Sequence, residues 1–187
     1  MTGAVFLDRD GTINKKAPYG QYILNKEQFE FLPGVLDALR FLHKNSERRI
    51  VIVTNQAAIG RGFTLRCEVN DLHAWVSQQV RQAGGLIHAF YICPHTIDDK
   101  CRCRKPQPGL LVQASREMEL DLARSVMVGD TMTDIQAGWR AGVGECYLST
   151  GGLSIVDWPD SWRGRRYKVV GGLWEVAQLI VEGRSVT

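Results

Sequence analysis

The stretch Ala4-Val5-Phe6-Leu7-Asp8-Arg9-Asp10-Gly11-Thr12 decides the fold, because an apolar segment ends abruptly in two carboxylates. The four apolar residues predict a buried strand over residues 4–7. Residues i and i+2 of a strand point to the same face, so Asp8 and Asp10 should converge. Two such carboxylates need a proton or a cation between them, and Mg²⁺ suits carboxylates together with phosphate. One carboxylate could then attack phosphorus, although an isolated pair is also typical of a helix cap.

Length and composition fit one domain over residues 1–187. The chain has 187 residues, 44% of them hydrophobic, and a net charge of +3, which suits a single domain with a full core. Its basic residues form only one small patch, at 163–166, so we expect no nucleic-acid partner. No charged leader and no apolar segment of membrane-spanning length are present, so we expect a cytoplasmic protein without a membrane partner.

Strand-like and helix-like segments alternate along the chain. Apolar runs bounded by turn residues predict strands at 4–7, 50–53, 89–92, 126–128 and 145–148. Periodic apolar stripes predict helices from residue 35 and at 65–82, 110–118, 134–140 and 173–180. The alternation predicts an α/β fold: a doubly wound, Rossmann-like parallel sheet with helices on both faces. Ligands bind such sheets beyond the carboxyl ends of the strands, where strand order reverses.

Polar residues gather at three later points where a binding site is expected. They are Thr54-Asn55-Gln56 after the second strand, Arg104-Lys105-Pro106 before the third helix, and Asp130 with Asp134 after the fourth strand. Taken alone, each group has an ordinary explanation as a turn, a solvated loop or an acidic helix start. The two acids lie about one helical turn apart and would share a face.

In order, these motifs resemble those of the haloacid dehalogenase-like phosphatases, over roughly residues 5–151. The resemblance implies an aspartyl-phosphate mechanism with four catalytic residues: Asp8 as nucleophile, Asp10 as general acid and base, and Thr54 and Lys105 holding the phosphoryl group. It also implies a catalytic Mg²⁺ held by Asp8, the backbone carbonyl of Asp10 and Asp130, with Asp134 in support. Phosphoryl transfer consists mostly of positioning and charge stabilisation, which these residue types can supply.

A cluster of soft ligands precedes Lys105. Cys93, His95, Cys101 and Cys103 form a complete tetrahedral set within residues 93–103, which predicts a structural Zn²⁺ in an inserted loop. The alternative is a loop of unrelated thiols. The isolated Cys67 and Cys146 are expected to be buried, small apolar residues.

The zinc loop beside the K-P motif resembles two phosphatase groups, one acting on heptose bisphosphate and one on histidinol phosphate. The stretches T-N-Q-A-A-I-G-R-G and K-P-Q-P-G favour the heptose group, which removes the C7 phosphate of D-glycero-D-manno-heptose 1,7-bisphosphate in nucleotide-heptose biosynthesis. Substrate-binding residues expected on this basis are Lys16, Tyr19, Asn55, Gln56, Ala57, Arg61 and Arg104. Ala57, Lys16 and Thr131 depart from the residues common in that group, which leaves the substrate, and especially its anomer, open.

The segments that usually carry large caps are short, so we expect no large cap and an open cleft. We expect a monomer acting on a phosphorylated sugar. The competing hypotheses are a histidinol-phosphate phosphatase and a non-enzymatic zinc module that binds a partner through residues 163–166.

Overall fold

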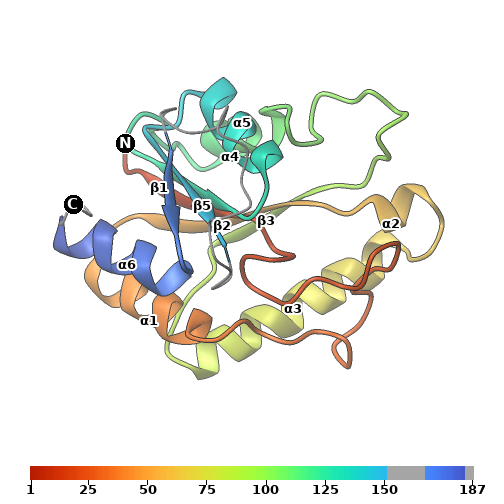
Figure 1. Ribbon diagram of the computed structural model, residues 1–187, viewed down its shortest axis with the longest axis horizontal. Coiled ribbons are helices and arrows are strands. Elements are labelled where there is room, and N and C mark those ends of the chain that lie inside the picture. Colours follow the sequence, from red (N-terminus) through yellow and green to blue (C-terminus); the bar gives the residue numbers. More distant parts are fainter. Residues whose placement is uncertain (151–166, 184–187) are drawn as a thin grey trace.

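The computed structural model describes residues 1–150 and 167–183 (Figure 1). Within these ranges one parallel sheet contains six strands: β1 (Ala4–Leu7), β2 (Arg49–Asn55), β3 (Ala89–Cys93), β4 (Val126–Gly129), β5 (Glu145–Ser149) and β6 (Lys168–Val170). Their order across the sheet is β3-β2-β1-β4-β5-β6. The five predicted strands are confirmed, whereas the short β6 was not predicted. The basic patch at 163–166 lies outside the described residues.

Helices connect the strands. They are α1 (Val35–Asn45), α2 (Ala57–Gly60), α3 (Arg66–Gln82), α4 (Gly109–Glu117), α5 (Met132–Ala141) and α6 (Leu173–Glu182). The five predicted helices are present with ends shifted by a few residues, and the short α2 is an addition. Glu68 fixes the start of α3, because its carboxylate accepts hydrogen bonds from the Leu65 N–H and the Thr64 hydroxyl, both at 2.7 Å.

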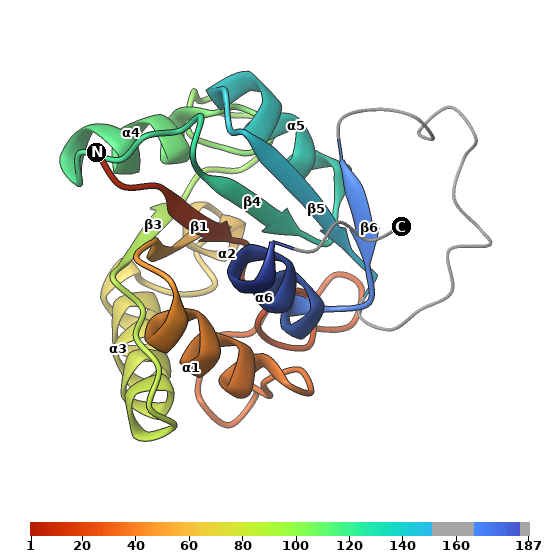
Figure 2. The ribbon, with the colours of Figure 1, turned by 90° about the vertical axis from the view of Figure 1, so that its left-hand side faces the viewer.

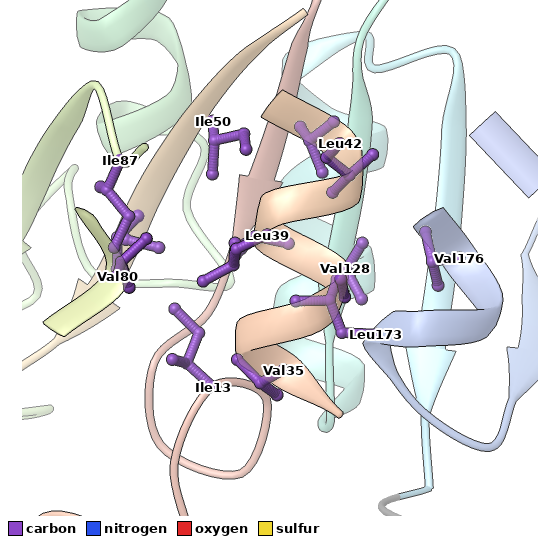
Figure 3. Close-up of a cluster of buried hydrophobic side chains, with 14 of the residues drawn as sticks. Ile13, Val35, Leu39, Leu42, Ile50, Val80, Ile87, Val128, Leu173 and Val176 are labelled. Atoms are coloured by element: carbon purple, nitrogen blue, oxygen red, sulfur yellow. The ribbon is translucent and has the colours of Figure 1, made fainter. Parts of the chain in front are cut away.

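Helices cover both faces of the sheet, as predicted. Strand β1 shows why, since Val5 and Leu7 point to one face and Ala4 and Phe6 to the other, all fully buried. The first pair belongs to a core shared with α1, α3 and α6 (Figure 3), and the second to a core shared with α4 and α5. Figure 2 shows the two helical layers on opposite sides of the sheet.

One cysteine prediction is wrong. Cys146 is buried as expected, but Cys67 is exposed. The buried stripe of α3 includes Val69, Leu72, Val76 and Val80, and Cys67, two residues before Val69, lies on the opposite side of the helix.

The strand order places the site. The chain runs outward from β1 through β2 to β3, then returns to place β4 on the other side of β1. Strand order therefore reverses between β1 and β4, where the Asp8 N–H donates to the Val128 carbonyl at 2.9 Å. The side chains that follow these two strands lie at this reversal.

Among residues 1–150 and 167–183, no cap domain lies over the reversal point, as predicted. The connections at residues 8–34 and 94–108, where such domains would be inserted, contain neither a helix nor a strand. Across the described ranges, the helices are too short or too polar to cross a membrane.

Candidate active site

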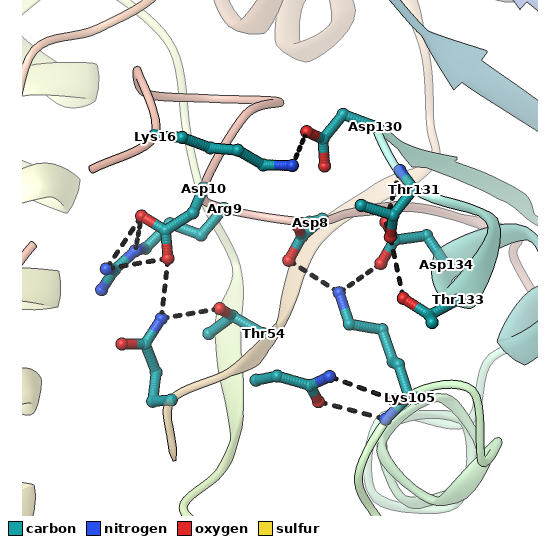
Figure 4. Close-up of polar contacts among 12 residues, drawn as sticks. Asp8, Arg9, Asp10, Lys16, Thr54, Lys105, Asp130, Thr131, Thr133 and Asp134 are labelled. Atoms are coloured by element: carbon teal, nitrogen blue, oxygen red, sulfur yellow. Dashed lines mark hydrogen bonds and ion pairs between the residues drawn. The ribbon is translucent and has the colours of Figure 1, made fainter. Parts of the chain in front are cut away.

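The structure brings the residues of all four motifs together at the carboxyl edge of the sheet (Figure 4). Asp8 and Asp10 follow β1, and Thr54 is the penultimate residue of β2. Asp130 follows β4, Asp134 lies in the first turn of α5, and Lys105 reaches in from the loop before α4. Strand ends meet at this edge of the sheet, which explains the convergence of Asp8, Asp10, Thr54 and Asp130. Lys105 and Asp134 reach the same place from a loop and from the start of a helix.

Lys105 lies at the centre of the site. It is 3% exposed, and its Nζ lies 2.6 Å from Asp8 Oδ1 and 2.6 Å from Asp134 Oδ1. Burial alone would lower the pKa of Lys105, but the carboxylates of Asp134 and Asp8 outweigh it, so the pKa is raised and the ammonium stays charged.

Asn55 holds the backbone of Lys105 in place. Its Nδ2 donates to the Lys105 carbonyl, and its Oδ1 accepts from the Lys105 N–H, both at 3.1 Å. The end of β2 is therefore fixed to the loop that carries the lysine. Asn55, predicted to bind substrate, thus positions Lys105, although it also borders two cavities.

Three carboxylates form a site suited to a hard cation. Asp8, Asp130 and Asp134 each place one oxygen within 4.8 Å of the others. Oδ1 of Asp130 is buried and has no hydrogen-bond partner among the residues that the structure describes. Burial raises the pKa of Asp8 to about 7 against the pull of Lys105, and the carboxylates of Asp134 and Asp130 add to the rise. An all-oxygen set with excess negative charge and an unpaired acceptor fits Mg²⁺.

Asp134 also caps its helix. Its Oδ2 accepts from the Thr131 N–H at 3.1 Å and from the Thr131 hydroxyl at 2.6 Å, while its Oδ1 faces Lys105. A Cβ at Gly129 would overlap the Asp134 side chain, so this approach requires glycine. The helix cap and Lys105 together fix the Asp134 carboxylate.

Asp10 lies apart from the other carboxylates and is held by donors. Its Oδ1 accepts from Arg9 Nη2 at 3.0 Å and from Asn14 Nδ2 at 2.9 Å, and its Oδ2 accepts from Gln56 Nε2 at 3.0 Å. Burial raises the pKa of Asp10, but the Arg9 charge and these hydrogen bonds outweigh it and hold the pKa below its usual value. Gln56 also donates to Thr54 Oγ1 at 2.8 Å, so it links two predicted catalytic residues.

Two cavities flank the carboxylates. One of about 250 Å³ lies beside Asp10 and is bordered by Lys16, Tyr19 and Gln56. The other, of about 330 Å³, is bordered by Arg104 and Lys105. Lys16 also forms an ion pair with Asp130. A larger cavity of about 450 Å³, between residues 24–27 and α3, contains none of the predicted catalytic residues.

Two of the predicted substrate-binding residues border neither flanking cavity. Ala57 is buried in the first turn of α2, and Arg61 is exposed.

The predicted zinc ligands also meet. Cys103 Sγ lies 3.2 Å from Cys93 Sγ, 3.4 Å from Cys101 Sγ and 3.2 Å from His95 Nδ1. Three thiols and one imidazole, each with one ligand atom within 4.8 Å of the others, fit a tetrahedral Zn²⁺ site without an open position. The Arg104 N–H donates to Cys101 Sγ at 3.3 Å, so the cluster is tied to the residue before Lys105.

Three residues hold Asp10 or its partners without having been predicted to do so. Arg9 and Asn14 contact Asp10 directly, and His73 of α3 contacts Arg9. The available signals were a charged residue within the strand-end motif and a histidine on the apolar stripe of a helix.

Comparisons with known proteins match this geometry. The HAD-hydrolase-like family model matches residues 102–175. The D-glycero-beta-D-manno-heptose-1,7-bisphosphate 7-phosphatase of Yersinia pestis is 38% identical over 160 residues, which cover 82% of this chain and 83% of the relative. The chain belongs to the heptose-1,7-bisphosphate 7-phosphatase family. The predicted resemblance to haloacid dehalogenase-like phosphatases is therefore confirmed.

Other members of this family add two findings. The relative from Mycobacterium tuberculosis (strain CDC 1551 / Oshkosh), 35% identical over 84% of this chain and 87% of its own length, is named for the alpha anomer. The D,D-heptose 1,7-bisphosphate phosphatase of B. bronchiseptica, solved with magnesium and phosphate, superposes with a TM-score of 0.85 at 29% identity, covering 98% of this chain and 100% of that one. The family thus includes proteins named for either anomer.

Proposed function

We propose that this chain hydrolyses the C7 phosphate of D-glycero-D-manno-heptose 1,7-bisphosphate, in nucleotide-heptose biosynthesis. The observation that carries the proposal is the meeting of Asp8, Lys105 and Asp130 at the strand-order reversal, with Asp10 held separately by donors. Support for the substrate comes from two relatives that are 38% and 35% identical to this chain over 82% and 84% of its length and are named for heptose bisphosphate.

In the proposed first step, a carboxylate oxygen of Asp8 attacks phosphorus and the bond from phosphorus to the sugar oxygen breaks. Asp10, in its protonated form, gives its proton to the departing sugar oxygen. Thr54 and Lys105 hold the transferring group, and the Lys105 ammonium offsets the charge that develops on it. The products of this step are the sugar alcohol and a phosphorylated Asp8.

In the second step Asp10, now ionised, takes a proton from water, and the water oxygen attacks phosphorus. Inorganic phosphate leaves and Asp8 regains its carboxylate. Mg²⁺, when bound by Asp8, the Asp10 carbonyl and Asp130 with support from Asp134, supplies positive charge for the phosphate oxygens. The donors around Asp10 favour its ionised form, which is the form that takes a proton from water in this second step.

The second proposed metal is a structural Zn²⁺ held by Cys93, His95, Cys101 and Cys103. Its role is to shape the loop that leads into Lys105. Arg104, whose Nη1 donates to the His95 carbonyl at 3.2 Å, borders the cavity beside Lys105 and is proposed to contact the distal part of the sugar. Lys16 and Tyr19 border the opposite cavity.

We further propose one domain over residues 1–187, acting in the cytoplasm as a monomer on this small sugar, without nucleic-acid or membrane partners. Support for a reducing compartment comes from Cys67 and Cys146, which are free thiols beside a cluster of thiol ligands.

The decisive experiment measures phosphate release from a panel of esters at saturating Mg²⁺. The panel contains both anomers of the heptose bisphosphate, histidinol phosphate and a generic sugar monophosphate, with Asp8→Asn as the inactive control. A heptose anomer should give the highest kcat/KM. Preference for histidinol phosphate would replace this proposal with its rival, and no release from any ester would favour a non-enzymatic zinc module.

A further inference from the structure

Arg9 is a fully buried arginine between the two acids of the first motif. It is 1% exposed, and its guanidinium has three sets of partners. Nε and Nη2 donate to Asp10 Oδ1 at 3.2 and 3.0 Å, Nη2 also donates to the Ile23 carbonyl at 3.2 Å, and Nη1 lies 3.2 Å from Nε2 of His73. A side chain with this many fixed partners has one orientation, which it imposes on the carboxylate it contacts.

His73 is the partner of Arg9 that comes from the helical layer. It lies on the buried stripe of α3, is 3% exposed, and stacks on Phe90 with ring centroids 4.3 Å apart and planes 17° apart. A guanidinium can only donate, so Nε2 of His73 must accept and the imidazole is neutral with its proton on Nδ1. Burial, together with the Arg9 charge, lowers the pKa of His73 to about 3, which agrees with the neutral form.

Packing alone does not account for a histidine at this position. Its Nδ1 is buried without a hydrogen-bond partner within the described residues, and a buried unpaired donor destabilises the fold. The neighbouring positions of the same stripe, Leu72 and Val76, carry apolar side chains, which avoid this cost. What the histidine supplies, and an apolar residue would not, is an acceptor for Arg9.

We infer that His73 and Arg9 are positioning residues for the reaction: His73 orients the Arg9 guanidinium, and Arg9 fixes the Asp10 carboxyl for proton transfer to the leaving oxygen. This inference rests on the proposed phosphatase mechanism. His73 acts only through Arg9, since its hydrogen-bonding contact is with the guanidinium and not with Asp10. Its removal should therefore affect the proton-transfer step more than binding.

The test compares two esters that differ in their need for an acid. A sugar monophosphate or the heptose bisphosphate must expel an alkoxide, whereas p-nitrophenyl phosphate expels a stabilised phenolate that needs little protonation. The ratio of kcat/KM for the two esters reports the use of Asp10, because kcat/KM covers the steps through transfer to Asp8 and excludes the later hydrolysis.

Three variants make the comparison. His73→Phe keeps an aromatic ring for Phe90 but removes the acceptor, His73→Gln restores an acceptor oxygen, and Val76→Ala opens a cavity on the same stripe without touching Arg9. We expect His73→Phe to lower kcat/KM roughly tenfold on the sugar ester, with little loss on p-nitrophenyl phosphate. The expected loss is smaller than the 10²–10⁴-fold that acid catalysis typically contributes, because Asp10 itself remains in place. His73→Gln should recover most of the loss, and Val76→Ala should lower Tm without changing the ratio.

The outcomes separate the two proposals. A wild-type enzyme that hydrolyses neither ester would overturn the proposed function itself. If the wild-type enzyme is active, two results would show that His73 is merely structural and would overturn the inference. One is an equal loss of kcat/KM on both esters in His73→Phe. The other is a change in the ratio of the two kcat/KM values that is as large in Val76→Ala as in His73→Phe. Should His73→Phe fail to fold, His73→Leu against His73→Gln makes the same comparison with a smaller side chain.

Discussion

Replacing Lys105 with methionine tests whether charge balance holds the site together. The ammonium lies 2.6 Å from each of two buried carboxylates, those of Asp8 and Asp134. Methionine keeps most of the side-chain volume but leaves both carboxylates without this cation. Removing one partner of a buried ion pair costs about 3–5 kcal/mol, so we expect a loss of this size in the free energy of unfolding without Mg²⁺.

The loss should depend on Mg²⁺. A dication bound to the same carboxylates would replace the missing charge, so saturating Mg²⁺ should reduce the loss in Lys105→Met by at least about 1 kcal/mol. The measurement should be made at pH 9, because without the ammonium the pKa of Asp8 rises above about 7 and protonation at lower pH would hide the effect.

Urea denaturation followed by tryptophan fluorescence supplies the free energies. Mg²⁺ should be removed by dialysis, since a strong chelator would also remove Zn²⁺ from the site proposed at residues 93–103. The matched control is Lys168→Met, which breaks an exposed pair with Glu145 at 3.5 Å and should change stability by less than about 1 kcal/mol in either buffer. A loss in Lys105→Met below about 1 kcal/mol, or one equal with and without Mg²⁺, would refute the charge-balance argument.

Four further outcomes are expected. Asp8→Asn should abolish turnover. Without Mg²⁺, the wild-type protein should lose stability as pH rises from about 4 to about 7, by up to about 1.4 kcal/mol per pH unit, because the folded state holds the Asp8 proton more tightly than the unfolded state does. Asp8→Asn should lack this pH dependence. Thermal melts of both proteins across this range check it, and parallel curves would contradict it. Asp10→Asn should turn over substrate slowly yet bind Mg²⁺ with an unchanged Kd in calorimetry, since its backbone carbonyl is the proposed ligand. Elemental analysis should find one Zn²⁺ per chain, and Cys101→Ser should lose both zinc and activity; zinc-free active protein would rule this out. Arg104→Ala should lower kcat/KM for the bisphosphate by a factor that corresponds to roughly 1.5–3 kcal/mol, and should change kcat/KM for a monophosphate ester little. An equal loss for both esters would mean that Arg104 only holds the loop, through its contact with the His95 carbonyl.

The sheet was predictable from sequence because its signals are local. Each of the first five strands is an apolar run bounded by turn residues, and the structure confirms all of them with small shifts at their ends. Strand β6 is only three residues long, and α2 only four, so neither has enough residues to show a period. Asp8, Asp10, Thr54 and Asp130 could be identified because they lie at strand ends, and strand ends meet at one edge of a parallel sheet.

The contacts that hold the motif residues were not predictable. Asn55 fixes the backbone of Lys105 across 50 positions of sequence, and His73 reaches Arg9 across 64. Such pairs depend on how α3 and the loop before α4 pack on the sheet, which a single sequence does not encode as a local pattern. Asn55 and Gln56 were therefore predicted as substrate contacts when each also positions a neighbouring functional group.

The central place of β1 in the sheet affects how the chain is made. Strand β1 is completely buried between β2 and β4, yet it is synthesised well before β4, which begins at Val126. At about 5–20 residues per second, β1 waits roughly 6–25 s for this neighbour. During that time the edge of β1 that later pairs with β4 is unpaired. A chaperone could bind the apolar side chains of the strand, or another nascent chain could pair with its edge. Asp8 meets Asp130 only after this interval, so a ribosome-bound fragment that ends before β4 would carry the proposed nucleophile without a complete site.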